Sequence, residues 1–326
     1  MPPSRRNLII IGCLCALVIF LAASVRVYQT KSTKGTGNEN WTERYLPYAP
    51  YLLPLRPDPS FIKKDDPASI TKPQAKVSPA ITAPNFIPVS AKAYLVGDIE
   101  SGKIYFEKNP RSVLPVASMS KLITAFVATD LIAPGTEITI SDSNAGLPGD
   151  TSHIGAGEKM PLETLLYPLL LSSSNVVAEA LAAATKENFF EQMSSYAWEV
   201  GMPSSYFADA SGLSPSNAAS ARDLFALAQY LFKFRPDILA ITRTPHMDIA
   251  TTTEHGGHSV DSTHPFVNDP GFIGGKTGRT PEAGETMMTL MKVNGKSIAV
   301  IILGSQFGGR EGDTRVLLQS AVKVVK

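Results

Sequence analysis

Ten prolines between Pro47 and Pro88 limit where this chain of 326 residues can fold. Proline has no backbone N–H and a fixed φ, so neither helices nor central strands are expected in residues 31–88. Lysine, aspartate, serine and threonine are interleaved with these prolines, and we expect an extended spacer. The globular part of the chain is therefore expected in residues 89–326, as one domain.

Residues 1–30 resemble a membrane-targeting segment. Arg5 and Arg6 precede Leu8–Val25, a run of 18 residues without charge. As a helix this run would span ~27 Å, about the hydrocarbon thickness of a bilayer. We favour a single-pass N-terminal membrane anchor. Two alternatives stay open: a secretory signal cleaved near Ala22-Ala23-Ser24, and lipid attachment at Cys13. All three place the rest of the chain outside the cytoplasm.

Charge separates the two parts of the chain. Residues 1–88 carry 11 basic and 5 acidic side chains, whereas residues 89–326 carry 19 basic and 24 acidic ones, a net charge of −5. A nucleic-acid-binding domain needs a dense basic face, so no nucleic-acid partner is expected. Both cysteines, Cys13 and Cys15, lie in the apolar run. Residues 89–326 therefore contain no disulfide, no thiolate metal ligand and no cysteine nucleophile.

Strand patterns occur at both ends of residues 89–326, with helical patterns between them. Ala91–Asp98 and Lys103–Lys108 predict one hairpin, and Thr286–Val293 and Ser297–Leu303 predict another around an Asn-Gly turn. Apolar residues at helical spacing predict helices at Met119–Leu131, Leu162–Leu171, Val176–Thr185, Phe189–Val200, Ala221–Phe232 and Thr314–Val325. This order predicts an α/β (α+β) domain whose sheet combines N- and C-terminal strands, with the helices inserted between them.

The first candidate for chemistry is Ser118-Met119-Ser120-Lys121. Residues three apart share one face of a helix, so Ser118 and Lys121 can touch in its first turn. Serine is a weak nucleophile until a neighbour removes its proton, and a lysine with a lowered pKa can be that base. The N–H groups of a helix N-terminus can stabilise an oxyanion. The same spacing recurs at Ser60–Lys63 and Ser320–Lys323, so the pattern alone is not specific.

Two further motifs follow along the chain. Ser173-Ser174-Asn175 separates two apolar helical patterns, and it predicts either a capped polar turn or a hydroxyl and an amide delivered to the Ser118 site. Lys276-Thr277-Gly278 follows two glycines, which allow a strand edge to approach a substrate backbone. Lysine and threonine there can hold a carboxylate, although a hairpin strand with a solvated lysine is the simpler interpretation of this motif taken alone.

In combination, S-x-x-K, then S-x-N 55 residues later, then K-T-G 103 residues after that resemble the serine DD-peptidases. The resemblance is to the D-alanyl-D-alanine carboxypeptidase family of low-molecular-mass penicillin-binding proteins, over about residues 89–326. Three segments carry it beyond the motifs: Ala117–Thr124, Ala210–Ser214 and Ser220–Leu224. It implies a β-lactamase/DD-peptidase-like fold with an antiparallel sheet of about five strands. The chain departs from the family where Val176-Val177 replaces the frequent Asp-Ala after Asn175.

The resemblance also implies roles for individual residues. Ser118 would be the acyl-ester nucleophile, Lys121 its base, and Ser173 a proton relay to the leaving amine. The substrate-binding residues implied are Asn175, Lys276, Thr277, Gly278 and Arg279, with the backbone N–H groups of Ser118 and Arg279 forming the oxyanion hole. The implied partners are peptidoglycan stem peptides as substrate and β-lactams as covalent inhibitors. The implied location is a bacterial cell membrane with an extracytoplasmic catalytic domain, and no cofactor or metal is expected.

Other functions fit the sequence less well. A class A β-lactamase uses a glutamate to activate the deacylating water, and no E-x-x-L-N segment follows Asn175. A metallopeptidase would need ligands such as His255, His258 and His264, which lack the helical H-E-x-x-H spacing. A Ser-His-Asp hydrolase is unsupported because no G-x-S-x-G occurs. A DD-endopeptidase with the same site and a non-catalytic peptidoglycan-binding protein stay open as alternatives.

Overall fold

The computed structural model of the protein describes residues 87–185 and 188–326, all within one unit that spans residues 79–326. The expected membrane segment, residues 1–30, and almost all of the expected spacer, residues 31–88, lie outside the described residues. Among the residues that are described, no helix combines the length and apolar character needed to cross a bilayer.

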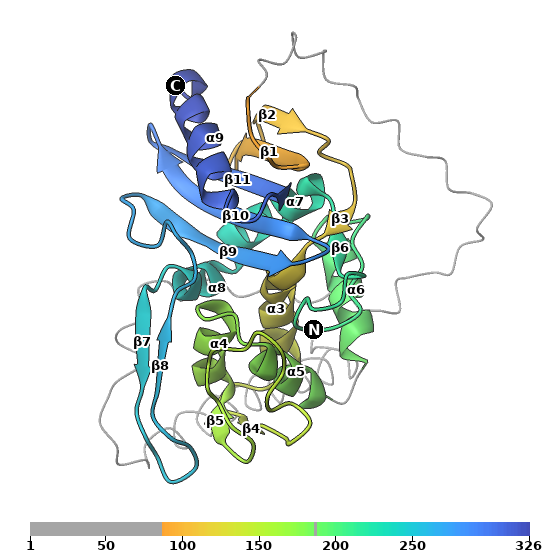
Figure 1. Cartoon of the computed structure of the whole chain (residues 1–326), viewed down its shortest axis with the longest axis vertical. Coiled ribbons are helices and arrows are strands. Elements are labelled where there is room, and N and C mark those ends of the chain that lie inside the picture. Colours follow the sequence, from red (N-terminus) through yellow and green to blue (C-terminus); the bar gives the residue numbers. More distant parts are fainter. Residues whose placement is uncertain (1–86, 186–187) are drawn as a thin grey trace, which may run out of the picture. The chain divides into compact units, whose positions relative to one another are not determined.

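A five-stranded antiparallel sheet joins the two ends of the domain (Figure 1). Its order is β2-β1-β11-β10-β9. The strands are β1 (Ala93–Asp98), β2 (Ile104–Lys108), β9 (Phe272–Thr280), β10 (Gly284–Val293) and β11 (Lys296–Ser305). Strand β1 pairs with β11 in the register Ala93↔Leu303. The sheet predicted from the two terminal hairpins is therefore confirmed, and β9 forms one of its edges.

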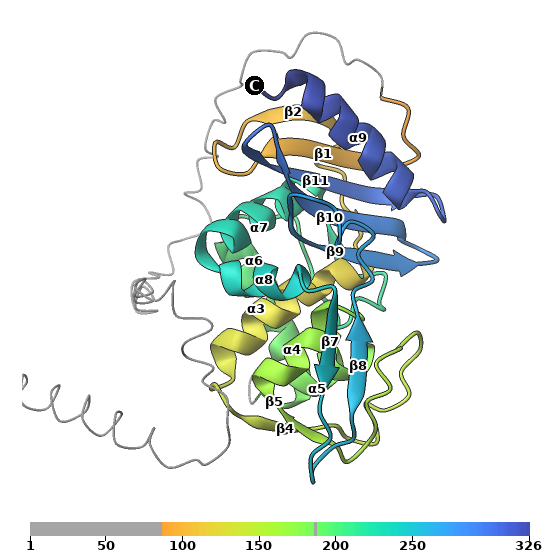
Figure 2. The same ribbon diagram turned by 90° about the vertical axis from the view of Figure 1, so that its left-hand side faces the viewer.

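Both faces of the sheet are covered, which explains the continuous apolar sequence of β11. Ile298, Val300 and Ile302 pack in the cluster that contains Leu317 of α9 (Arg310–Val324). The alternating residues Ala299, Ile301 and Leu303 belong to the core cluster on the other side. Figure 2 shows α9 over one face of the sheet and α7 (Ala221–Phe234) over the other. Period-two alternation thus places apolar side chains in two separate layers.

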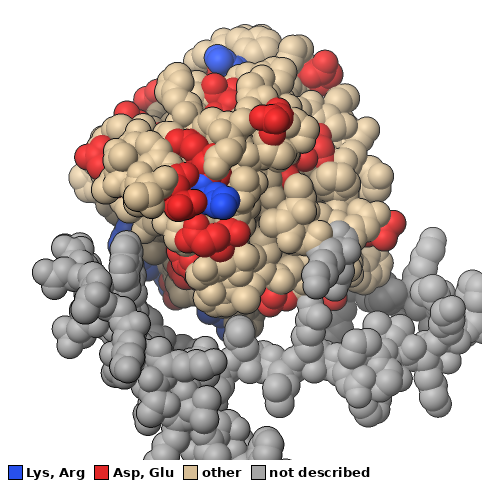
Figure 3. Space-filling view, turned by 90° about the horizontal axis from the view of Figure 1, so that it is seen from below, with Lys and Arg blue, Asp and Glu red and all other residues tan. Residues whose placement is uncertain are grey.

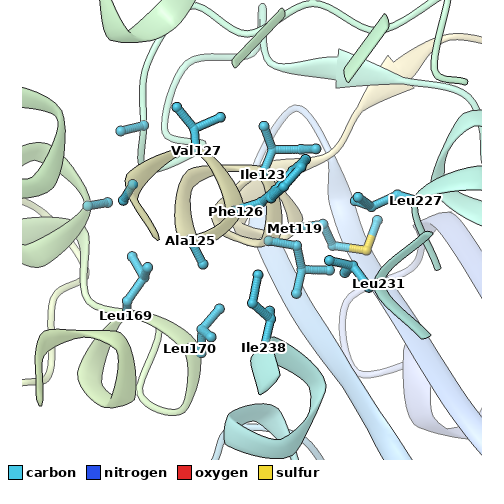
Figure 4. Packing of buried hydrophobic residues seen from close by; sticks show 14 of the residues in the cluster. Met119, Ile123, Ala125, Phe126, Val127, Leu169, Leu170, Leu227, Leu231 and Ile238 are labelled. Atoms are coloured by element: carbon cyan, nitrogen blue, oxygen red, sulfur yellow. The ribbon is translucent and has the colours of Figure 1, made fainter. Parts of the chain in front are cut away.

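The helices follow β2 and precede β9, as predicted. They are α3 (Lys121–Leu131), α4 (Leu162–Leu170), α5 (Asn175–Ala183), α6 (Phe189–Glu199), α7 and α8 (Pro236–Thr242). Every residue of α3 from Lys121 to Ala128 is buried. Figure 4 shows side chains of α4, α7 and α8 around Ile123 and Phe126 of α3, at the centre of the core. A helix packed on all sides holds its first turn in a fixed position.

Several elements differ from the sequence expectation. The helix expected from Met119 begins instead with a 3₁₀ turn, η2 (Ala117–Ser120), and α3 starts at Lys121. The last helix starts at Arg310 rather than Thr314, with Glu311 and Asp313 in its first turn, where acidic groups favour the helix dipole. Helix α8 and the short strand pairs were not predicted: β3 (Leu114–Pro115) with β6 (Ala218–Ala219), β4 (Glu137–Thr139) with β5 (Lys159–Pro161), and β7 (His246–Ile249) with β8 (His258–Asp261).

Candidate active site

Ser118 lies in the tight η2 turn between β3 and α3, and its side chain is half-buried. The preceding residue, Ala117, adopts φ +50°, which is uncommon for a residue with a Cβ. Gly212 packs so closely on this turn that a Cβ there would lie 2.1 Å from the Ala117 carbonyl oxygen. The Ser120 hydroxyl donates to the same carbonyl at 2.8 Å. These contacts fix the position of the Ser118 backbone.

Lys121 follows on the first turn of α3, fully buried, and its ammonium nitrogen has three polar neighbours. Nζ lies 3.0 Å from Ser118 Oγ, 2.7 Å from Asn175 Oδ1 and 2.5 Å from the Ser211 carbonyl oxygen. The expected contact between Ser118 and Lys121 is therefore present. The acceptor Ser211 O was not predicted, because a backbone carbonyl leaves no mark in a sequence pattern.

Burial lowers the pKa of Lys121 from 10.5 to about 7, since a buried ammonium has lost its hydration. The carboxylates of Asp209, Asp150 and Glu179 act in the opposite direction and keep the pKa from falling further. A lysine with this pKa is neutral in a large fraction of molecules near neutral pH, as a general base requires.

The second motif lies in the turn between α4 and α5. Ser173 has φ +64°, and Ser174 is the N-cap of α5, where it accepts from the Val177 N–H at 3.1 Å. Ser174 therefore caps α5, whereas its neighbour Ser173 contacts Lys276 of the third motif. Asp150 fixes the turn, because its carboxylate accepts from Ser174 Oγ at 2.6 Å and from the Val176 N–H at 2.9 Å.

The third motif lies on β9, whose outer edge faces η2 and α8 (Figures 1 and 2). Lys276 is 1% exposed, so the solvated-lysine interpretation is wrong. Its Nζ donates to Ser173 Oγ at 2.8 Å and to the Thr277 carbonyl at 3.0 Å. Burial lowers the pKa of Lys276 well below its usual value, and the positive charges of Lys121 and Arg310 lower it further. The structure thus links all three motifs through Lys121 and Lys276.

Gly278 and Arg279 complete this end of β9. A Cβ on Gly278 would lie 2.5 Å from Thr286 Oγ1 and 2.9 Å from the Val116 carbonyl oxygen, so only glycine lets β9 approach the η2 turn this closely. Arg279 is exposed. Arg310 of α9, which the sequence did not single out, donates from Nη1 to the Gly278 carbonyl at 3.2 Å. This contact was not predicted, because the last helix was expected to start at Thr314 and Arg310 therefore lay outside it.

The histidines that a metallopeptidase would need have other contacts. Nε2 of His258 lies 3.0 Å from a Glu158 carboxylate oxygen. His264 is buried, with its ring 4.6 Å from that of Phe272, and burial lowers the pKa of His264 to about 3. In the part of the chain that the structure describes, no three His, Cys, Asp or Glu side chains are grouped as metal ligands.

This fold and arrangement of motifs define a serine DD-peptidase, a hydrolase of the penicillin-recognising class. Residues 78–306 match the family model described as D-alanyl-D-alanine carboxypeptidase. The chain belongs to this family, as its three motifs predicted.

Curated relatives include peptidases with two activities. A D-alanyl-D-alanine endopeptidase of Pseudomonas aeruginosa is 29% identical over 217 residues, which is 64% of this chain and 69% of the relative. The D-alanyl-D-alanine carboxypeptidase DacF of Bacillus subtilis is 26% identical over 241 residues, 71% of this chain and 62% of the relative.

Solved structures share the fold. A penicillin-binding protein of Listeria monocytogenes in a cefotaxime-bound form matches with a TM-score of 0.64 and 28% identity, covering 73% of this chain and 98% of that one. A D-alanyl-D-alanine carboxypeptidase of Mycobacterium tuberculosis matches with a TM-score of 0.67 and 23% identity, covering 75% and 96%. The predicted DD-peptidase-like fold is confirmed.

Proposed function

We propose that this protein is a D-Ala-D-Ala carboxypeptidase that trims peptidoglycan stem peptides through an acyl-enzyme on Ser118. The observation that carries this proposal is the 3.0 Å contact between Nζ of the fully buried Lys121 and Oγ of the half-buried Ser118. Attack by Ser118 Oγ on the carbonyl of the penultimate D-Ala forms the ester bond, and the terminal D-Ala leaves as an amine. Water then hydrolyses the ester.

The contacts of Lys121 suit a neutral amine acting as the base. A neutral lysine has two N–H donors and one lone pair. Asn175 Oδ1 and Ser211 O can accept the two N–H groups, which directs the lone pair towards the Ser118 hydroxyl. Asn175 is itself held by the bond from its Nδ2 to the Pro148 carbonyl at 2.7 Å.

The other motif residues take complementary parts. Ser173 Oγ accepts from Lys276, so its own proton is free to pass to the leaving amine. Lys276 and Thr277 would bind the terminal carboxylate of the peptide. No carboxylate is among the charges that shift the pKa of the buried Lys276 amine, and a bound carboxylate would favour its ammonium form. The N–H groups of Ser118 and Arg279 would stabilise the oxyanion.

Partners and location follow from the same proposal. Stem peptides are the substrate, and β-lactams are expected to acylate Ser118 as substrate mimics. On the face in Figure 3, acidic side chains gather around few basic ones, which argues against a nucleic-acid partner. We further propose an extracytoplasmic domain held at a bacterial membrane by residues 1–30, on the basis of the uncharged run Leu8–Val25. Sedimentation of the full chain with membranes, and its loss on deletion of residues 1–30, tests this point.

The second candidate is DD-endopeptidase activity on cross-linked stem peptides. The curated endopeptidase of Pseudomonas aeruginosa, at 29% identity, favours it. Both activities cut the same type of D-amino acid bond and differ in the leaving group. Incubation with pentapeptide and with cross-linked muropeptides, followed by mass analysis, separates them. Release of D-Ala alone supports the carboxypeptidase, and cleavage of cross-links alone rules it out in favour of the endopeptidase.

A further inference from the structure

After the β7–β8 hairpin the chain passes beside the third motif at Thr263, a residue outside all three motifs. The Thr263 N–H donates to the Leu171 carbonyl at 3.0 Å, two residues before Ser173. Its Oγ1 lies 3.1 Å from the same carbonyl oxygen and 3.0 Å from Thr277 Oγ1. Thr263 is exposed, whereas Thr277 is 4% exposed. Thr263 thus joins the second and third motifs from the open side of the site.

The hydroxyls of Thr263 and Thr277 can form hydrogen bonds in two alternative arrangements, because each carries a single proton. Each hydroxyl has one O–H donor and two acceptor lone pairs. In the first arrangement, Thr263 donates to Leu171 O and Thr277 donates to Thr263. In the second, Thr263 donates to Thr277 and the Thr277 proton becomes available to a ligand. The Leu171 carbonyl keeps the Thr263 N–H as a donor in both arrangements, so the hydroxyl can turn away from it without leaving an unpaired backbone group.

A carboxylate bound beside Thr277 favours the second arrangement. A hydrogen bond to a charged acceptor is roughly twice as strong as a neutral one. When Thr277 also accepts a proton from Thr263, its own O–H is polarised and becomes a better donor. The pair therefore adopts the second arrangement when an anion is bound beside Thr277, and the first arrangement when the site is empty.

We infer that Thr263 is a positioning residue that directs the Thr277 hydroxyl to the terminal carboxylate of the substrate and so contributes to selection of peptides with a free C-terminus. This inference rests on the proposed carboxylate site at Lys276 and Thr277. The hydroxyl is the part of the side chain that matters, because the backbone bond to Leu171 does not depend on it.

Substitution of the hydroxyl tests the inference in the full chain. Thr263→Val keeps the shape of the side chain and should lower kcat/KM for a free-acid peptide about 3- to 10-fold, mainly through KM, as expected for one hydrogen bond. The amidated peptide should change less than about 2-fold. Thr263→Ser should restore the free-acid rate. Thr253→Val, at the exposed far end of the same hairpin, is the matched control and should behave as the wild type.

Thr277→Val separates this inference from the proposed function. If Thr277→Val loses the preference for the free acid and Thr263→Val loses part of it, both are supported. If Thr277→Val loses the preference and Thr263→Val keeps it, the Thr263 inference is wrong and the carboxylate site stands. If Thr277→Val keeps the preference, the proposed carboxylate site is wrong. An equal loss on both peptides in Thr263→Val, unrescued by serine, would indicate a structural role and overturn the inference.

Discussion

The burial of Lys121 makes a quantitative prediction for the pH dependence of acylation. With a pKa of about 7, about half of the amine is neutral at pH 7 and about 1% at pH 5. With its usual pKa of 10.5, only about 0.03% would be neutral at pH 7. Removal of the side chain from water therefore increases the population of the neutral amine, the form proposed to act as the base, roughly a thousandfold.

The direction of the pH dependence follows from the proposed role of Lys121 as the base. Below the pKa of Lys121 the ammonium has no lone pair for Ser118, so the rate should fall about tenfold for each pH unit below 7 and level off above about pH 8. The assay is the second-order rate constant for labelling by a fluorescent penicillin, followed between about pH 5 and about pH 9.5. A rate that still rises tenfold per unit above pH 9, or one that does not change with pH, would refute the assignment.

Glu179 provides an independent check on the same pKa. Its Oε1 accepts from the N–H groups of Ala210 and Ser211, and its negative charge raises the pKa of Lys121. Glu179→Gln keeps an acceptor oxygen and removes the charge, so the acidic limb of the labelling rate should move to lower pH. Movement of the limb to higher pH would contradict the electrostatic argument.

Four other changes have expected outcomes. Ser118→Ala should abolish penicillin labelling on a gel while the melting temperature stays close to wild type. Lys276→Ala should abolish the preference for a peptide with a free C-terminal carboxylate, because this residue is proposed to bind that group; a variant that keeps the wild-type preference would show that another residue holds the carboxylate. Gly212→Ala should lower the free energy of unfolding by about 2–4 kcal/mol in urea titration, because φ is +83° and the new Cβ collides with a backbone oxygen. Asp313→Asn should lower the free energy of unfolding by about 1.5–3 kcal/mol in the same titration and leave kcat/KM unchanged, since its carboxylate accepts hydrogen bonds from Ser90, Ala91 and Ser305, outside the three motifs; a loss of activity at full stability would be evidence against this.

That one sheet combines strands from both ends of the domain could be predicted because the two terminal hairpins carry strong local signals. The Asn294-Gly295 turn between the two apolar runs of β10 and β11 identifies the last hairpin in sequence alone. The β7–β8 hairpin was not predicted, because its sequence carries no comparable signal. Its eight residues include only two buried side chains, Ile249 and Val260, so no apolar alternation marks it. The seven-residue helix α8 is too short for a clear helical period.

The candidate site was predicted as far as side chains in motifs can define it. The order of the motifs predicts that Ser118, Lys121 and Asn175 lie close together. It does not predict the residues outside the motifs that hold these side chains in place. Ser211 acts through a backbone oxygen, and Asp150 acts through the cap of α5. Such contacts depend on how distant segments pack, which local spacing does not encode. The roles assigned to the individual site residues stay predictions until the substitutions above are made.

The pairing of β1 with β11 has a consequence for how the protein is made. Partners such as Ala93 and Leu303 are 210 positions apart, so the ribosome must synthesise β11 before β1 can pair with it. Closing so long a loop is slow, and until then β1 has an unpaired, apolar edge that can associate with other chains. A product that stops before Lys296 would contain all three motifs and no strand to hold β1 beside β10. We therefore expect late truncations to aggregate rather than to accumulate as a partly active enzyme.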